Sequence, residues 1–411
     1  MNSLFITVDG YQDYLQSLFL PILSKTIDEH HKINVLEFCP SNISLRNSIS
    51  SAAKKYNIPI LFAKYINKPP VLSSFILILY GAYKIKNVIR KKKIDVLIPR
   101  SIIAGAMVLL VRIFNSKIII IYEADGLVAD ERIEFGGWKP GGLLYKLAVF
   151  TENKLVELSE RVITRTQRNK DILYKRANGH IGLSKIHVIP NGKDSTIFRP
   201  YKDNEIKMIR SKYNLEMYNL LLIYVGSIGA QYKPDLMLDL HEKLLAKEPN
   251  AFFLILTPNI EVMKQKVATR KLKNVIIDTV NNDKIPFYLS AADYGIAFRE
   301  PSFSQSGICP IKLIEYFMCG LPVITNKGVG DFDVIFQKYD KIGYIVEDLS
   351  SIDLSSIVDW ILTTKGPVHK VYEENCRKLA LKEFDLDLIG NKYKSVLFPL
   401  INVTGRSIKN V

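Results

Sequence analysis

The sequence has few cysteines, no long apolar run and no cluster of histidines. Its four cysteines (Cys39, Cys309, Cys319 and Cys376) are scattered and form no Cys-x-x-Cys pair. Since the chain begins without a signal-peptide pattern, we expect reduced thiols and a cytoplasmic protein. Its apolar runs fall short of the roughly 18 residues that a membrane span requires. The six histidines show no ligand spacing, so we expect no metal and no other cofactor.

Acidic residues are also in deficit. The chain has 56 Lys and Arg against 41 Asp and Glu, which gives a formal charge of +15. Nucleic acid, an anionic membrane surface or a small polyanionic substrate would each suit this charge, and so would a Lys-rich surface with no special partner. The sequence lacks helix-turn-helix spacing, zinc-finger ligands and an aromatic RNA-binding signature. We therefore expect no nucleic-acid partner.

One apolar stretch, from Ser73 to Tyr83, runs directly into a basic stretch from Lys84 to Lys93. An apolar segment followed by cations is typical of an interfacial helix on an anionic membrane. A core helix with a solvated end gives the same pattern. The sequence leaves both interpretations open, and the first predicts an anionic membrane surface as a partner.

The chain is too long for one ordinary hydrophobic core, and its 48% hydrophobic content allows two domains. In the first half, short Val- and Ile-rich runs alternate with longer helical patterns. The expected strands are 3–8, 33–38, 94–98, 117–122, 161–164 and 185–189, and the expected helices are 11–30, 43–56, 71–92 and 102–114. This alternation predicts a doubly wound parallel sheet.

A turn-rich connector follows over 190–200, and the alternation then resumes. The expected strands of the second half are 220–225, 252–256, 274–277, 294–298 and 322–325. We therefore expect an α/β fold of two Rossmann-like domains, over 1–197 and 198–385, that face a central cleft. A C-terminal helix within 386–411 would return to the first domain. Ligands of such sheets bind beyond the carboxyl ends of the strands.

A glycine loop follows the strand at 220–225. Gly226 and Gly229 form the turn, Lys233 closes it, and Pro234 suits the first turn of a helix. Such a loop leaves N–H groups beside the positive end of a helix, which favours an anion. An ordinary strand–helix turn with a surface lysine would look the same.

A second loop follows the strand at 294–298. Arg299 closes that strand, and a Ser- and Gly-rich loop with Ser306 and Gly307 leads to a helix that begins near Pro310. Lys312 and Glu315 lie three residues apart on its first turns. A carboxylate there could bind the hydroxyls of a ribose while the loop N–H groups bind phosphate. A surface Lys–Glu pair is the plainer alternative.

Together these segments resemble the retaining glycosyltransferases of family 4, which have the GT-B architecture. The stretch 309–325 resembles their nucleotide-sugar signature, in the variant in which Ser-Pro-x-Lys-x-x-Glu-Tyr precedes a Gly-x-Pro-Val strand. The stretch 188–200 resembles their inter-domain segment, and 224–237 resembles their phosphate loop. The resemblance covers almost the whole chain. It implies a nucleoside-diphosphate sugar as donor, retention of configuration and no metal.

The resemblance also assigns roles to single residues. It implies that Glu315 binds the donor ribose and that Lys233 binds the diphosphate. Several relatives carry an Arg where this chain has Ser227, and we expect Arg299 to supply that charge. Many relatives carry a further glutamate where this chain has Gly307, so the Ser304 and Ser306 hydroxyls or loop N–H groups would recognise the sugar. The expected donor site therefore comprises Gly226, Ser227, Gly229, Lys233, Ser306, Gly307, Lys312 and Glu315.

In the first domain, Asp125 follows the strand at 117–122 and Gly10 follows the first strand. Asp125 would orient the acceptor hydroxyl or the donor sugar, or else it is a solvated Asp-Gly turn. Gly10 allows close approach of an acceptor.

These residues predict glycosyl transfer to a lipid-linked or growing surface glycan. Lys233 and Arg299 would stabilise charge on the leaving diphosphate, and Asp125 would act beside them. A membrane-bound acceptor predicts a cytoplasmic enzyme that is peripheral on the inner face of the cell membrane. A nucleotide-sugar epimerase and a non-catalytic adaptor of the same fold are the alternatives.

Overall fold

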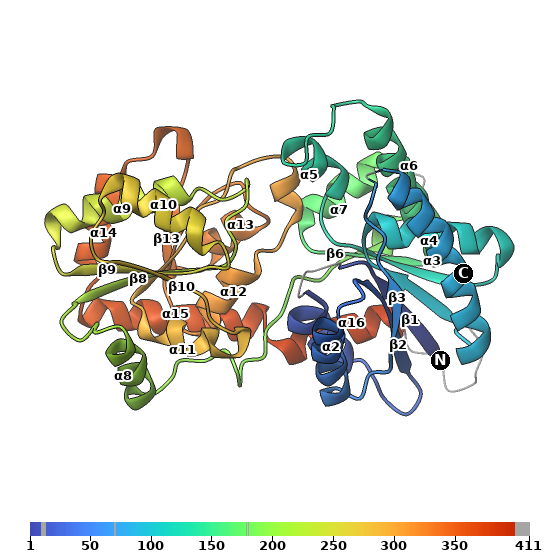
Figure 1. Cartoon of the computed structure of the whole chain (residues 1–411), viewed down its shortest axis with the longest axis horizontal. Helices are drawn as coiled ribbons and strands as arrows, with labels where there is room; N and C mark the ends of the chain where they lie inside the picture. The colour runs from blue at the N-terminus through green and yellow to red at the C-terminus, as the bar shows by residue number, and fades with distance from the viewer. Residues whose placement is uncertain (10–13, 70, 178, 180, 399–411) are drawn as a thin grey trace. The chain divides into compact units, whose positions relative to one another are not determined.

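The computed structural model describes residues 1–9, 14–69, 71–177, 179 and 181–398. The chain divides into two compact units (Figure 1). Unit 1 comprises Met1–Pro190 and the chain from Leu386 onward, and unit 2 comprises Asn191–Asp385. The first boundary thus falls after Pro190, at the start of the predicted connector. The sequence had suggested a boundary after residue 197.

Unit 1 is built on a parallel sheet of seven strands in the order β3-β2-β1-β4-β5-β6-β7. The order runs outward in both directions from β1 and β4, as in a doubly wound sheet. The strands are β1 (Asn2–Thr7), β2 (Lys32–Cys39), β3 (Ile60–Lys64), β4 (Val96–Pro99), β5 (Ile119–Ala124), β6 (Arg161–Thr164) and β7 (Ile186–Val188).

Helices connect and cover these strands (Figure 1). They are the π-helical η1 (Leu15–Phe19), α1 (Leu20–Ser24), α2 (Ile43–Lys55), α3 (Leu72–Lys92), α4 (Ser101–Phe114), α5 (Val128–Glu134), α6 (Leu143–Leu158), α7 (Gln167–Arg176), the 3₁₀ turn η2 (Leu183–Lys185) and α16 (Leu386–Leu397). Helix α4 packs against both α3 and α6, and α16 packs separately against α1. The last helix therefore belongs to unit 1.

Unit 2 has a six-stranded parallel sheet in the order β10-β9-β8-β11-β12-β13. Its strands are β8 (Leu220–Val225), β9 (Ala251–Leu256), β10 (Val275–Asp278), β11 (Tyr294–Ala297), β12 (Val323–Asn326) and β13 (Gly343–Val346). Its helices are α8 (Asp203–Lys212), α9 (Pro234–Lys247), α10 (Ile260–Arg270), α11 (Ile285–Ala291), α12 (Ile311–Met318), α13 (Phe332–Lys338), α14 (Leu354–Thr363) and α15 (Pro367–Glu383), with 3₁₀ turns η3 (Asn282–Lys284), η4 (Ser304–Gly307) and η5 (Leu349–Ser351).

Strand β8 shows why the sequence produces this sheet. Leu221, Ile223 and Val225 enter one hydrophobic cluster, while Leu220, Leu222 and Tyr224 enter another. Since successive side chains of a strand point to opposite faces, both faces of the sheet are covered. A continuous apolar run without polar alternation is the mark of such a strand. The predicted fold of two Rossmann-like α/β units is confirmed in this respect.

Two strands were missed in the sequence, and both lie at sheet edges. β3 ends one side of the first sheet and β13 ends one side of the second. Most of their residues are only partly buried. Their apolar runs, 60–63 and 344–346, are short, and a short apolar run gives a weak signal for a strand.

The predicted helix over 11–30 is too long at its C-terminal end. Residues 11–13 lie outside the described residues, and α1 ends at Ser24. The Asp28 carboxylate accepts hydrogen bonds from the backbone N–H groups of His30 and His31, at 2.8 and 2.9 Å. An aspartate that bonds its own following backbone stabilises a turn in place of a helix.

Helix α3 is long and apolar enough to cross a membrane, by length and composition alone. It spans 21 residues, and an 18-residue window has a mean hydropathy of 1.2. The expectation that no segment reaches this length was therefore wrong. Its inner face nevertheless packs as a layer of unit 1, because a Cβ at Gly81 would meet the side chain of Met107 on α4.

Candidate active site

The predicted donor loops lie at the carboxyl ends of two neighbouring strands of unit 2. Gly226 follows β8 with a φ of +130°, a conformation that side chains rarely adopt. Arg299 follows β11, which pairs directly with β8. Helix α9 begins at Pro234 and α12 at Ile311, as the sequence predicted. The two loops therefore open on the same edge of the sheet.

Backbone pairing joins these loops to one another. Tyr232 and Arg299 form an antiparallel bridge. The Glu300 N–H donates to the Gln231 carbonyl at 2.8 Å, and the Lys233 N–H donates to the Phe298 carbonyl at 3.3 Å. The glycine loop is thereby fixed against the segment that carries Arg299.

Lys312 is a buried cation of this region, with 9% of the residue exposed. Its ammonium donates to the Tyr224 hydroxyl at 2.9 Å and lies 3.8 Å from the centre of the Tyr232 ring. A Cβ at Gly226 would come within 3.0 Å of the same nitrogen. Burial lowers the pKa of Lys312 to about 8. A ligand that reaches the Gly226 backbone therefore meets the Lys312 ammonium.

Arg299 contacts Tyr232 as well, from the end of β11. Its Nη1 donates to the Tyr232 hydroxyl at 3.1 Å, and its Nε donates to Gln305 Oε1 at 2.7 Å. Burial acts to raise the pKa of Tyr232, but Lys312 and Arg299 outweigh it and bring the pKa below its usual range. Two cations thus converge on one side chain that sequence reasoning did not assign.

Tyr316 explains how α12 is held so that Lys312 points at this edge. Its buried hydroxyl accepts the N–H of Val225, at the end of β8, at 3.0 Å. Its ring packs against β11 where Gly295 has no side chain, since a Cβ there would lie 2.4 Å from the ring. The tyrosine of the Glu-Tyr pair therefore fixes the helix to the sheet.

Lys233 has a different partner from the one expected. At the start of α9 it forms an ion pair with Glu300, and 38% of its side chain is exposed. Its positive charge is therefore balanced by a carboxylate of the chain. The role predicted for it requires Lys233 to leave Glu300.

Glu315 also has a partner that the sequence analysis missed. Its Oε1 lies 2.7 Å from the ammonium of Lys193, a buried residue of the connector. The Lys193 N–H donates to the Phe384 carbonyl at 3.0 Å, which fixes its backbone. Because Lys193 lies far away in the sequence, no spacing pattern could have revealed the pair.

The remaining predicted donor residues lie along the two loops. The Ser306 hydroxyl donates to the Phe303 carbonyl at 2.6 Å, and Gly307 is buried in η4. The Ser227 carbonyl accepts from the Tyr224 hydroxyl at 2.7 Å. A Cβ at Gly229 would meet the end of the Gln231 side chain at 2.6 Å.

In unit 1, charged residues follow four adjacent strands at their carboxyl ends. Asp9, Arg100 and Arg165 follow β1, β4 and β6, while Asp125 follows β5. Arg100 pairs with Asp9 and, at 2.5 Å, with Asp125. Arg165 lies 3.5 Å from Asp125 and 2.5 Å from Glu123. Negative and positive groups therefore alternate along this edge.

Aromatic side chains complete this network. The guanidinium carbons of Arg100 and Arg165 lie 4.5 and 5.4 Å from the centre of the Phe19 ring. The Tyr393 hydroxyl, from α16, accepts from Arg165 at 2.8 Å and donates to Glu123 at 2.7 Å. The last helix of unit 1 is thereby tied to the strand edge.

The pKa values of Glu123, in β5, and of Asp125, directly after it, shift in opposite directions. Burial raises the pKa of Glu123 to about 7. Burial also acts to raise the pKa of Asp125, but Arg100 and Arg165 outweigh it and hold the pKa below its usual range. Asp125 is therefore an ionised partner of two arginines and not a solvated turn. Gly10, the other predicted acceptor residue, lies outside the described residues.

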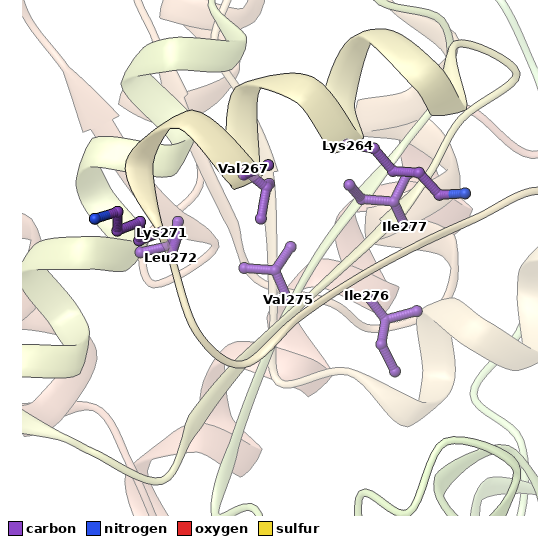
Figure 2. Close-up of a pocket in the computed structure, with 8 residues that line it drawn as sticks. Lys264, Val267, Lys271, Leu272, Val275, Ile276 and Ile277 are labelled. Carbon is purple, nitrogen blue, oxygen red and sulfur yellow. The ribbon is translucent and has the colours of Figure 1, made fainter.

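Two pockets lie apart from these groups. One, of about 360 Å³, lies between α10 and β10 and is lined by aliphatic side chains with Lys264 and Lys271 (Figure 2). The other, of about 330 Å³, lies beside the first residues of β8 and β11. Neither is lined by a predicted site residue. Among the residues that the structure describes, no group of three or more His, Cys, Asp or Glu side chains is placed to hold a metal ion.

Residues 205–379 match the family model described as Glycosyl transferases group 1. This stretch, within unit 2, is therefore similar in sequence to group 1 glycosyl transferases. The match includes both loops and every predicted donor residue from Gly226 to Glu315. The converging cations therefore lie within the stretch that resembles this family.

A curated relative extends the likeness in sequence. TuaH of Bacillus subtilis (strain 168), named as a teichuronic acid biosynthesis glycosyltransferase, is 25% identical over 184 residues. The match covers 42% of this chain and 44% of TuaH. The chain thus spans less than half the length of the relative that it matches.

Solved structures share the fold of the whole chain. HepE of Anabaena, in complex with UDP and glucose, has a TM-score of 0.73 at 15% identity, with 97% of this chain and 100% of that chain covered. WaaG, a glycosyltransferase involved in lipopolysaccharide biosynthesis, has a TM-score of 0.67 at 16% identity, with 97% and 100% covered. A glycosyltransferase from Rickettsia africae ESF-5 has a TM-score of 0.71 at 18% identity, with 97% and 99% covered. The predicted GT-B fold class is confirmed.

Proposed function

We propose that this chain is a glycosyltransferase that moves a sugar from a nucleoside diphosphate to a saccharide acceptor. The observation that carries the proposal is the convergence of Lys312 and Arg299 beside Gly226. Both cations are buried, and both lie at the carboxyl edge of a group 1 domain. A buried pair of cations at that edge suits a diphosphate, because ligands of such sheets bind there.

The chemistry of glycosyl transfer explains why cations are needed. As the bond from the sugar to the diphosphate breaks, negative charge grows on the leaving phosphate oxygens. Groups that are already oriented toward that charge stabilise the transition state more than the ground state. In this proposal Lys312 and Arg299 supply that charge without a metal ion, and Lys233 joins them when it leaves Glu300.

Glu315 is the group that we assign to the donor ribose. It lies one turn beyond Lys312 on α12, so a nucleotide whose phosphates meet Lys312 can bring its ribose to the Glu315 carboxylate. The ion pair with Lys193 orients that carboxylate. The sugar itself would contact the Ser306 and Gly307 loop.

The relatives suggest which substrates should be tested first. HepE binds UDP and UDP-glucose in its crystal structures. TuaH and WaaG are named for the biosynthesis of teichuronic acid and lipopolysaccharide. We accordingly infer a UDP-sugar as the first donor to test, a lipid-linked or growing surface glycan as acceptor, and retention of the anomeric configuration. In unit 1, Asp125 would face that acceptor.

Membrane attachment is the second part of the proposal. Exposed apolar side chains follow one face of α3, including Phe75 at 50% and Leu79 at 65% exposed. A second exposed stripe follows α6, with Leu143, Leu147 and Phe150 four and three residues apart. Both helices pack against α4 in the same layer (Figure 1). We infer that this layer lies on a membrane surface.

Cations accompany the apolar stripes. Lys86 of α3 lies 5.4 Å from the centre of the Phe114 ring at the end of α4, and Lys154 lies 5.9 Å from the Phe150 ring. The last turn of α3 carries Arg90, Lys91 and Lys92. An apolar face bordered by cations matches an anionic bilayer surface. The enzyme would then be cytoplasmic and peripheral on the inner face of the cell membrane.

A donor assay tests the proposed activity. The purified chain is incubated with UDP-glucose, GDP-mannose, CDP-activated and ADP-activated sugars, and free nucleoside diphosphate is measured. We expect slow release with one donor even when no acceptor is present, and Lys312→Met should abolish it. Conversion of the donor to an epimer without release would indicate an epimerase, and no reaction or binding with any donor would indicate an adaptor.

A further inference from the structure

Tyr232 lies between two buried cations of unit 2, Arg299 and Lys312. Its hydroxyl accepts from Arg299 Nη1 at 3.1 Å, and the guanidinium carbon lies 4.7 Å from the centre of its ring. The Lys312 ammonium lies 3.8 Å from that ring centre and donates to the hydroxyl of the neighbouring Tyr224. One side chain is therefore in contact with both charges.

The phenol is held in place from two directions. Its backbone forms the bridge to Arg299 at the end of β11. Its ring meets the edge of the Tyr224 ring on β8, with centroids 6.1 Å apart. Since the backbone and the ring are both restrained, the hydroxyl stays at the point where the cations converge.

Two cations at this distance from one phenol need a compensating group. Arg299 and Lys312 repel each other, and burial strengthens that repulsion because the surroundings are less polar than water. The ring face of an aromatic side chain and a hydroxyl oxygen both attract cations. Tyr232 offers both features to Lys312 and Arg299.

We propose that Tyr232 is a positioning residue, which keeps Lys312 charged and directs both Lys312 and Arg299 at the diphosphate of the donor. This inference rests on the proposed function. Tyr232 acts through the two cations and makes no step of the reaction itself. Its hydroxyl takes the place of an anion before the donor arrives.

The charge state of Lys312 gives the proposal a specific signature. The groups that face its ammonium are Tyr224 from β8, Tyr232 from the glycine loop, Arg299 from the end of β11 and Glu315 from its own helix. Burial and Arg299 favour the neutral amine, whereas Tyr232 and Glu315 favour the ammonium. Loss of the Tyr232 hydroxyl should therefore make Lys312 lose its proton at lower pH.

Titration calorimetry with UDP tests this inference on the full chain. UDP affinity of the wild type should fall as the pH rises through about 8, where Lys312 loses its charge. Tyr232→Phe keeps the ring and removes the hydroxyl, so it should weaken UDP binding about tenfold or more. It should also move the alkaline loss of affinity to lower pH. Tyr344→Phe, on β13, is the matched control and should change neither quantity.

A double substitution separates positioning from general damage. If Tyr232 acts through Lys312, then Tyr232→Phe should weaken UDP binding far less in the Lys312→Met background than in the wild type. Additive losses, or an unchanged alkaline midpoint in Tyr232→Phe, would overturn the inference. Circular dichroism checks that each variant is folded. If the wild type binds none of UDP, GDP, CDP and ADP, the proposed function fails first, and this inference fails with it.

Discussion

Arg100 bridges Asp9 and Asp125, whose carboxylates come from strands on either side of β4. The bridge ties together the carboxyl ends of β1, β4 and β5. Because the arginine is buried, it could not remain there without carboxylate partners. Asp125 therefore supports the sheet edge, whatever part it also takes in catalysis.

Asp125→Asn should destabilise the chain. The change weakens the charge-assisted contacts to Arg100 and Arg165, and we expect a loss of about 2 kcal/mol in the free energy of unfolding. Urea unfolding followed by circular dichroism measures it. Asp171→Asn, on the exposed face of α7, is the control and should change stability by about 0.5 kcal/mol or less. A variant of wild-type stability that has lost turnover would instead make Asp125 a catalytic group.

Because of Glu123, the free energy of unfolding should decrease as the pH rises. The pKa of Glu123 is raised to about 7 in the folded chain, against about 4.3 when unfolded. Between these values the folded state binds more protons, so the free energy of unfolding decreases with increasing pH. Glu123→Gln should reduce that slope when thermal unfolding is measured from pH 4.5 to 7.5.

The slope should be reduced and not abolished. Burial also raises the pKa of Glu152 to about 7 and the pKa of Glu37 well above its usual value, so both act in the same direction. Glu29→Gln, on an exposed turn, is the control. Equal slopes in the wild type and Glu123→Gln would show that Glu123 is already ionised beside Arg165 at low pH.

Glu315→Gln should weaken the binding of nucleotides but not of pyrophosphate. An amide keeps the size of the side chain and loses the charge that ribose hydroxyls would bond to. We expect UDP affinity to fall about tenfold or more, while inorganic pyrophosphate, which has no ribose, should bind as before. Parallel losses for both ligands would show that Glu315 acts through Lys193 and the fold of the connector. Unchanged affinity for both ligands would show that Glu315 forms a structural ion pair with Lys193 and does not bind the nucleotide.

Substitution of Lys233 should impair use of the donor, whereas substitution of its partner Glu300 should strengthen nucleotide binding. Lys233→Gln should lower kcat about a hundredfold if the ammonium reaches the leaving diphosphate, with a smaller rise in KM. Glu300→Gln should release the ammonium and strengthen UDP binding. Steady-state kinetics and calorimetry measure the two effects. Wild-type turnover in Lys233→Gln would show that the lysine stays paired with Glu300 and does not stabilise the leaving diphosphate.

The sequence predicted the fold well where local signals were strong. The buried strands carry continuous apolar runs, and Pro234 and Gly320 mark helix ends. The edge strands β3 and β13 carry apolar runs as well, but these runs are short and were not recognised as strands. The order of the strands, and hence which loops are neighbours, was not a local property at all.

The candidate site was predicted in part for the same reason. Its motif residues could be located because they follow one another in the sequence. Their partners could not, because Lys193 meets Glu315, and Arg165 meets Glu123, only through the fold. Tyr232 stood inside the glycine loop that was recognised. Nothing in its spacing showed that its hydroxyl meets Arg299.

Membrane attachment can be tested with vesicles of defined charge. The wild type should sediment with anionic vesicles at low salt and much less with neutral ones, because exposed cations and apolar stripes act together. Each Lys or Arg near an anionic surface contributes about 1 kcal/mol, and the attraction fades within a Debye length. Replacing Arg90, Lys91, Lys92 and Lys93 by Gln should therefore release the chain, while activity on a short soluble acceptor stays unchanged.

Substitutions in the exposed apolar stripes of α3 and α6 should weaken vesicle binding independently of the cations. Leu79→Ser with Phe150→Ser removes one exposed side chain from α3 and one from α6. This pair should weaken binding at high salt, where charge is screened, because apolar burial does not depend on ionic strength. Met208→Ser with Met217→Ser, exposed in unit 2, is the control and should change nothing. If neutral and anionic vesicles bind the wild type equally, the apolar stripes alone attach the chain and its positive charge belongs to the composition. If neither binds, the layer of α3 and α6 has another partner.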